Sequence, residues 1–132
     1  INLRMPGVLT SNRHTERPWL NLVLNKIRNK KKLKIFNLNT KFNSVIDTKE
    51  IYEFIKFVLK NKFISGNYNF MANNPLKLLQ ILKILKKINM SDSQIKNLGR
   101  KNIQTISNLK IRKTFKFKIS PVKKIILRNI ND

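Results

Sequence analysis

The sequence predicts an α/β fold, and two adjoining features carry this prediction. Val45 and Ile46 are β-branched and bounded by polar residues, which is typical of a short strand. Asp47 follows directly and stands three residues before Glu50, the spacing of a helix N-terminal capping box with Asp in place of Ser or Thr. The next apolar residues recur at the spacing of one helix face: Ile51, Phe54, Ile55, Val58 and Leu59. A strand that leads into a capped amphipathic helix belongs to an α/β layer.

The elements before this stretch are predicted from short local patterns. Residues 1–9 favour a buried strand that ends in a turn at Pro6-Gly7, followed by a polar loop over 10–17. Thr15 is a plausible N-cap for a helix that starts near Pro18 and runs to about Asn29. A short strand is expected over 33–36 and a turn over 37–40.

The elements after it follow in the same way. Tyr68 and Phe70 alternate as in a strand, and Asn74 then caps a helix with Pro75 as its first residue. The apolar stripe of that helix is Leu78, Leu79, Leu82, Leu85 and Ile88. Residues 89–101 are predicted to be a polar link, 103–106 a short strand, and Ser107 the cap of a brief helical turn. Ser120 and Pro121 begin a closing helix.

Length and charge limit the classes of protein that fit. The chain has 132 residues, enough for one domain with a core. Its 29 Lys and Arg residues against 6 Asp and Glu residues give a net charge of +23. Such a surplus suggests nucleic acid or an anionic membrane surface as partner. The reading we favour is that Lys, Asn and Ile are over-used together, as an AT-rich genome imposes on any protein.

Other sites are disfavoured by composition. The chain has no Cys and one His, so we expect neither disulfides nor a metal site. No apolar run approaches the roughly 18 residues of a membrane span, and no signal-peptide pattern opens the chain, so a cytoplasmic location is the default expectation. The first residue is Ile1 and a strand-like phrase begins at once, which suggests a fragment.

Three phrases resemble the C-terminal portion of the NAD-dependent epimerase/dehydratase family, the extended short-chain dehydrogenase/reductases. They occur in the family's order: 3–8 (LRMPGV), 45–51 (VIDTKEI) and 66–75 (GNYNFMANNP). Residues 108–120 are similar to the family's closing phrase, without its Asp or its Leu-Gly pair. The resemblance implies the C-terminal part of a Rossmann-type enzyme with its small mixed α/β substrate-binding subdomain. Residues 1–9 would then end the cofactor-domain sheet, and 10–132 would form the substrate subdomain.

The resemblance also implies a site and a function. Pro6, Gly7 and Val8 would line the cofactor pocket beside the nicotinamide of NAD or NADP. Asn12, His14 and Asn43 would contact the substrate, a nucleotide sugar or related sugar, although a lone loop histidine is more often solvated. The chain would be the substrate-binding part of an NAD(P)-dependent epimerase, dehydratase or reductase. The sugar, the reaction, the choice between NAD and NADP and homodimer formation by the full-length protein stay open.

Departures from the family pattern predict that the chain is inert by itself. Its glycines, Gly7, Gly66 and Gly99, are too scattered for a phosphate-binding loop, so we expect no cofactor to bind this chain alone. The catalytic Tyr and Lys should lie in a missing N-terminal Rossmann portion. Tyr52 and Lys56 have the Tyr-x-x-x-Lys spacing but stand after the Pro-Gly strand, so we attribute the match to chance. Asn43 appears where many relatives have an Arg that contacts substrate phosphate, which weakens the nucleotide-sugar prediction.

Two other classes of function remain as alternatives. A small basic nucleic-acid-binding protein fits the net charge and the basic runs at 29–32 and 110–118, but no recognised motif or aromatic stacking array accompanies them. A membrane-surface helix over 78–87 fits the basic amphipathic pattern, but such a stripe is more often a core face. We therefore disfavour both partners.

Overall fold

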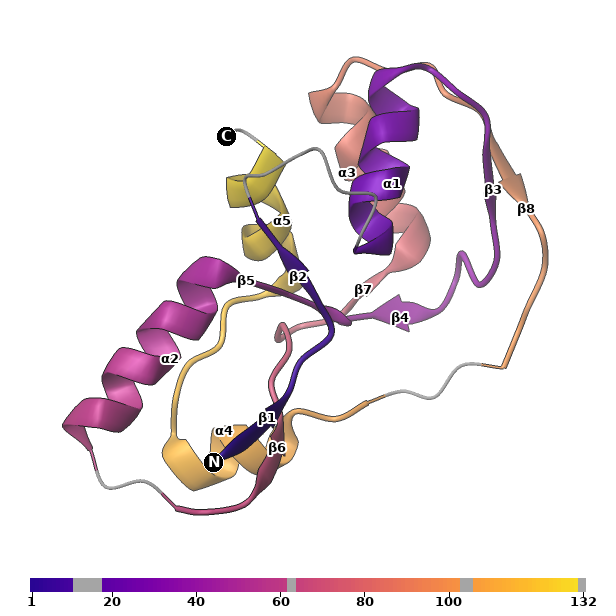
Figure 1. Cartoon of the computed structure of the whole chain (residues 1–132). Helices are drawn as coiled ribbons and strands as arrows, with labels where there is room; N and C mark the ends of the chain where they lie inside the picture. The colour runs from indigo at the N-terminus through magenta and orange to yellow at the C-terminus, as the bar shows by residue number, and fades with distance from the viewer. Residues whose placement is uncertain (11–17, 62–63, 103–105, 131–132) are drawn as a thin grey trace. The chain divides into compact units, whose positions relative to one another are not determined.

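A computed structural model describes residues 1–10, 18–61, 64–102 and 106–130 as a mixed α/β chain (Figure 1). Thr15 and most of the strand predicted over 103–106 lie outside the described residues. The chain divides into two compact units. The first unit comprises Ile1–Ser11, Asn43–Pro75 and Thr105–Asp132, and the second comprises Asn12–Phe42 and Leu76–Gln104.

Parallel strand pairs organise the first unit. β1 (Asn2–Arg4) pairs with β6 (Asn67–Asn69), and β2 (Gly7–Leu9) pairs with β5 (Val45–Asp47). The predicted strand over 1–9 is therefore broken in the middle rather than ended by a turn at Pro6-Gly7, because Gly7 begins β2. Pro6 has no N–H to donate to a ladder, which accounts for the break at this point.

The structure describes three helices in the first unit. They are α2 (Thr48–Lys60), α4 (Leu109–Phe115) and α5 (Val122–Ile130). The closing helix was predicted, whereas α4 is longer than the brief turn expected there. One face of α5 is buried, since Val122 and Ile125 are 0% exposed and Ile126 is 1% exposed.

The buried face of α2 differs from the predicted one. Phe54 is 1% exposed, but Ile55 and Leu59 are 49% and 81% exposed. Phe54 packs against Phe70 and Phe115 at ring-centroid distances of 4.9 and 5.4 Å. This aromatic contact and the burial of Glu50 turn the helix so that the predicted stripe is only partly covered.

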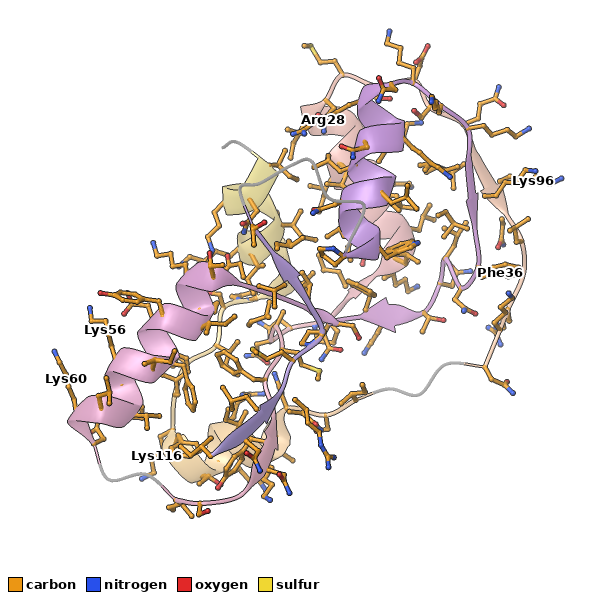
Figure 2. All side chains as sticks on the ribbon, in the orientation of Figure 1. Arg28, Phe36, Lys56, Lys60, Lys96 and Lys116 are labelled. Carbon is orange, nitrogen blue, oxygen red and sulfur yellow. The ribbon has the colours of Figure 1, made fainter. Side chains whose placement is uncertain are left out.

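The second unit contains two helices and two strand pairs. α1 (Trp19–Arg28) packs against α3 (Leu78–Ile88), and both bury leucine and isoleucine side chains. β3 (Leu33–Ile35) pairs in parallel with β8 (Ile95–Asn97), and β4 (Lys41–Phe42) pairs antiparallel with β7 (Leu76–Lys77). Figure 2 shows Arg28 at the end of α1, where its Nε donates to Asn89 Oδ1 at 3.2 Å.

Two sequence predictions about this unit are wrong. The helix expected from Pro75 begins at Leu78, because Leu76 and Lys77 are extended in β7 and the Gln80 side chain accepts the Lys77 N–H at 3.0 Å. The predicted polar link contains β8, which has a single apolar residue, Ile95, and owes its extended form to pairing with β3 rather than to its own propensity.

Within the part of the chain that the structure describes, no helix combines the length and the apolarity that a bilayer crossing requires.

Candidate functional site

The β2–β5 pair brings four of the predicted site residues onto one strand pair. Gly7 lies opposite Val45 and Val8 opposite Ile46. Pro6 directly precedes β2, and Asn43 precedes β5 and accepts the Val45 N–H on its carbonyl oxygen at 2.7 Å. Pro6 and Asn43 therefore share the N-terminal end of the pair, and both side chains are half-buried.

The other two predicted substrate residues, Asn12 and His14, lie outside the described residues. They follow β2 in the chain, whereas Asn43 precedes β5. The predicted substrate contacts of all three residues stay predictions.

The C-terminal end of β5 carries a buried carboxylate. Asp47 is 1% exposed and accepts the Glu50 N–H on Oδ1 at 2.9 Å, which confirms it as the cap of α2. In a complete capping box the Glu50 side chain would also accept the Asp47 N–H. Its carboxylate instead accepts hydrogen bonds from Arg128 on α5 and from the Ser120 N–H, two residues before α5.

Arg128 joins both carboxylates to α5. Its Nη2 donates to Asp47 Oδ1 at 2.6 Å and to Glu50 Oε1 at 2.7 Å, and its Nε donates to Asp47 Oδ2. Asn129 Nδ2 donates to Asp47 Oδ2 at 2.8 Å, and the Ser120 N–H donates to Glu50 Oε2 at 3.0 Å. We call Asp47, Glu50, Arg128 and Asn129 the carboxylate cluster.

Burial and pairing act in opposite directions on the charges of the carboxylate cluster. Burial alone would raise the pKa of Asp47, but the hydrogen bonds from Arg128, the Glu50 N–H and Asn129 lower it below its usual value. Burial alone would lower the pKa of Arg128, but its hydrogen bonds to Asp47 and Glu50 raise it. Both groups are therefore held in their charged forms.

The carboxylate cluster is suited to holding α5 against the start of α2 and is poorly suited to proton transfer. A catalytic base needs a pKa near the working pH and a lone pair free for substrate. Asp47 has a lowered pKa and accepts from Glu50, Arg128 and Asn129. We assign the carboxylate cluster a structural role.

The Tyr52 and Lys56 pair does not have the geometry of a catalytic pair. Lys56 Nζ lies 5.1 Å from the centroid of the Tyr52 ring, and both residues are exposed. The ammonium group is therefore placed against the ring face, as in a surface cation–π contact. That the spacing is a coincidence stays a prediction.

Sequence reasoning found Asp47 and Glu50 but missed Arg128 as their partner. The pair Asp47 and Arg128 is separated by 81 positions. In a chain with 29 cationic side chains, nothing local marks one Arg as the buried one. The signal that was present is the scarcity of acids, because three of the six, Asp47, Glu50 and Glu53, stand at intervals of three residues.

The chain matches no protein-family model and no curated protein. It is similar to solved structures of sugar-nucleotide enzymes. The enzyme WbmG of Bordetella bronchiseptica, in complex with NAD and UDP, has a TM-score of 0.72 at 10% identity. The dTDP-glucose 4,6-dehydratase of Bacillus anthracis, in complex with NAD, has a TM-score of 0.70 at 12% identity. The UDP-N-acetylglucosamine 4-epimerase of Methanobrevibacter ruminantium, in complex with UDP-N-acetylmuramic acid, has a TM-score of 0.64 at 18% identity.

These matches cover 98% of this chain and 42–43% of the length of the three proteins. Identities this low show a common fold and no more. The fold is that of part of the extended short-chain dehydrogenase architecture, which confirms the predicted α/β class. The chain spans less than half of the proteins that share this fold.

Proposed function

We propose that this chain is the C-terminal, substrate-binding part of an NAD(P)-dependent sugar-nucleotide epimerase, dehydratase or reductase. The observation that carries the proposal is the structural match over 98% of the chain to enzymes solved with NAD, NADPH, UDP or a UDP-sugar. The order of the three resembling phrases along the sequence supports it independently. In this role the chain forms a wall of the nucleotide-sugar pocket beside a cofactor-binding Rossmann portion.

The proposal places the dinucleotide site outside this chain. A pyrophosphate group is normally held by a glycine-rich loop at a helix N-terminus. The three glycines of this chain, Gly7, Gly66 and Gly99, are separated by 59 and 33 positions. NAD or NADP would supply hydride transfer in the full-length protein. The contribution proposed for this chain is limited to the backbone of Pro6, Gly7 and Val8 beside that cofactor.

Asn43 provides a test of substrate contact. In the proposed site it faces a substrate phosphate, and Asn donates a hydrogen bond but lacks the charge and the fork of Arg. We expect Asn43→Arg to raise the affinity for UDP by about tenfold, because a charge-assisted hydrogen bond contributes about 1.5–3 kcal/mol. Isothermal titration calorimetry with UDP measures the change.

Ser44→Arg is the matched control, because it adds the same charge one position away at an exposed residue. Equal gains for both variants would show that the effect comes from net charge and would count against a substrate role for Asn43.

The whole proposal is tested upstream of the chain. We expect the DNA before the Ile1 codon to encode, in frame or after a frameshift, a glycine loop and a Tyr-x-x-x-Lys pair. The longer protein should then convert one member of a panel of UDP- and dTDP-sugars with NAD or NADP, as followed by proton NMR. A start codon with no such frame, together with no binding of any nucleotide sugar, would overturn the proposal.

A further inference from the structure

A concave surface of the first unit is strongly basic. It is a cavity of about 580 Å³ formed by α4, the segment that follows it and the start of α5. Five of its eleven lining residues are cationic: Arg112, Lys113, Lys116, Lys118 and Lys124. Of the described residues that line it, none is acidic. We call this surface the α4–α5 cavity.

The fold gathers these cations, and none of them pairs with a carboxylate among the residues that the structure describes. Asp47 and Glu50, two of the four acidic residues that the structure describes, are engaged by Arg128 in the carboxylate cluster. Lys116 is fixed at the end of α4 in the left-handed conformation, with φ of 52° and its N–H donating to Arg112 O at 3.0 Å. Figure 2 shows Lys116 at this helix end.

The chemistry of the cavity favours phosphate groups over bases. Arg presents a planar fork that matches phosphate oxygens, and Lys adds point charges around it. Phe117, the aromatic residue of the lining, packs its ring against Phe54 and Phe57 at centroid distances of 5.2 and 5.4 Å. Phe117 is half-buried and its ring is engaged by these neighbours, so it is a poor platform for the base stacking that single-stranded nucleic acid normally uses.

We propose that the α4–α5 cavity binds a compact polyphosphate, the chemical class of a small anion with two or more linked phosphates. The volume falls within the range of about 300–1,000 Å³ that is typical of small-molecule sites. Several clustered cations suit linked phosphates better than a single one, because each phosphate adds a charge-assisted contact. This inference does not rest on the proposed function, since neither Asn43 nor the β2–β5 pair lines the cavity.

The test is calorimetric titration of the full 132-residue chain with inorganic triphosphate at about 0.15 M ionic strength, where the Debye length of about 8 Å screens distant charges. The test variant is Arg112→Gln/Lys113→Gln/Lys124→Gln, which leaves the backbone-constrained Lys116 in place. The matched control is Lys49→Gln/Lys56→Gln/Lys60→Gln, which removes the same net charge from α2. Figure 2 shows Lys56 and Lys60 extending outward from that helix.

We expect the cavity variant to bind triphosphate at least tenfold more weakly, with less than a twofold change in the α2 variant. Equal losses in the two variants, or no binding by the unchanged chain, would overturn the proposal. A single-stranded oligonucleotide that binds and is not displaced by triphosphate would also overturn it, in favour of nucleic acid.

Lysine acetylation read by mass spectrometry gives a measurement without any variant. Triphosphate should protect Lys113, Lys116 and Lys124 at least fivefold and leave Lys49 and Lys60 unchanged. Uniform protection of all five lysines would show diffuse binding and would contradict a site.

Discussion

At the scale of single residues, the first unit depends on buried charges that are compensated by hydrogen bonds. Arg128 donates to both Asp47 and Glu50, and Asn129 donates to Asp47. Breaking a buried ion pair from one side leaves the partner charge buried without compensation, which is costly. We therefore predict that acid lowers the stability of the first unit.

Asp47→Asn should destabilise the chain by about 3 kcal/mol at pH 7, because it removes the ion pair while keeping a side chain that caps helices. The hydrogen bonds from Arg128, the Glu50 N–H and Asn129 hold the folded pKa of Asp47 below its ordinary value of 3.8. Its contribution is therefore fully present above that unfolded value and is lost as pH falls through the lower folded pKa. The difference between wild type and variant in urea unfolding should shrink below about pH 4.

Glu53→Gln is the control for this prediction, because Glu53 lies on the same helix and is exposed. A change of less than about 0.5 kcal/mol is expected there. A pH-independent difference between wild type and Asp47→Asn would show that the ion pair does not provide the stability.

At the scale of elements, the sequence predicted the helices that are determined by neighbouring residues. Asp47 capping and the apolar spacing after it gave α2, and the Ser120-Pro121 start gave α5. β8 and β7 were missed because their pairing partners lie about 60 and 35 positions away, and their own residues favour no strand. The predicted buried face of α2 was wrong for the same reason, since distant phenylalanines select it.

Only those residues of the candidate site that match the family phrases could be predicted from the sequence. Pro6, Gly7, Val8 and Asn43 lie together on the β2–β5 pair, but their ligand contacts stay predictions. The α4–α5 cavity was visible only as a basic run over 110–118, which composition alone does not separate from the rest of a basic chain. Lys116 occupies a left-handed position, which nothing in the basic run predicted.

Phe54→Ala tests how far one helix depends on these distant rings. Phe54 contacts Phe70, Phe115 and Phe117 at centroid distances of 4.9, 5.4 and 5.2 Å, so its removal leaves a cavity among them. We expect a loss of about 3–5 kcal/mol in urea unfolding followed by circular dichroism. Tyr52→Ala, on the same helix at 58% exposure, should cost less than about 0.5 kcal/mol. Similar losses for both would contradict the assigned core face.

At the scale of the whole molecule, the described strands form four separate two-stranded sheets, three of them parallel. Parallel strands are normally part of larger sheets covered on both faces. The strands described here thus keep edges that another chain could pair with. α2 adds an apolar stripe, with Tyr52, Ile55 and Leu59 at 58%, 49% and 81% exposure. Both features favour self-association of this chain.

The net charge of +23 opposes that association, so salt should control it. Repulsion extends about 30 Å at 0.01 M ionic strength and only about 3 Å at 1 M. We expect the 132-residue chain to be monomeric at the lower salt concentration and to associate at the higher one, as measured by sedimentation velocity. Ile55→Lys/Leu59→Lys should shift the onset of association to higher salt.

Ser44→Lys/Thr48→Lys separates the loss of apolar surface from the gain of charge. Both positions are exposed, and the variant adds the same two charges without changing the α2 stripe. If the stripe drives association, this control follows the unchanged chain at 1 M salt, where added charge is screened, while the stripe variant associates less. If both variants resist association equally, the stripe is not its cause. A chain that stays a monomer at both salt concentrations and unfolds cooperatively would show that the open edges are satisfied within this chain, and the need for a covering Rossmann portion would fall with them.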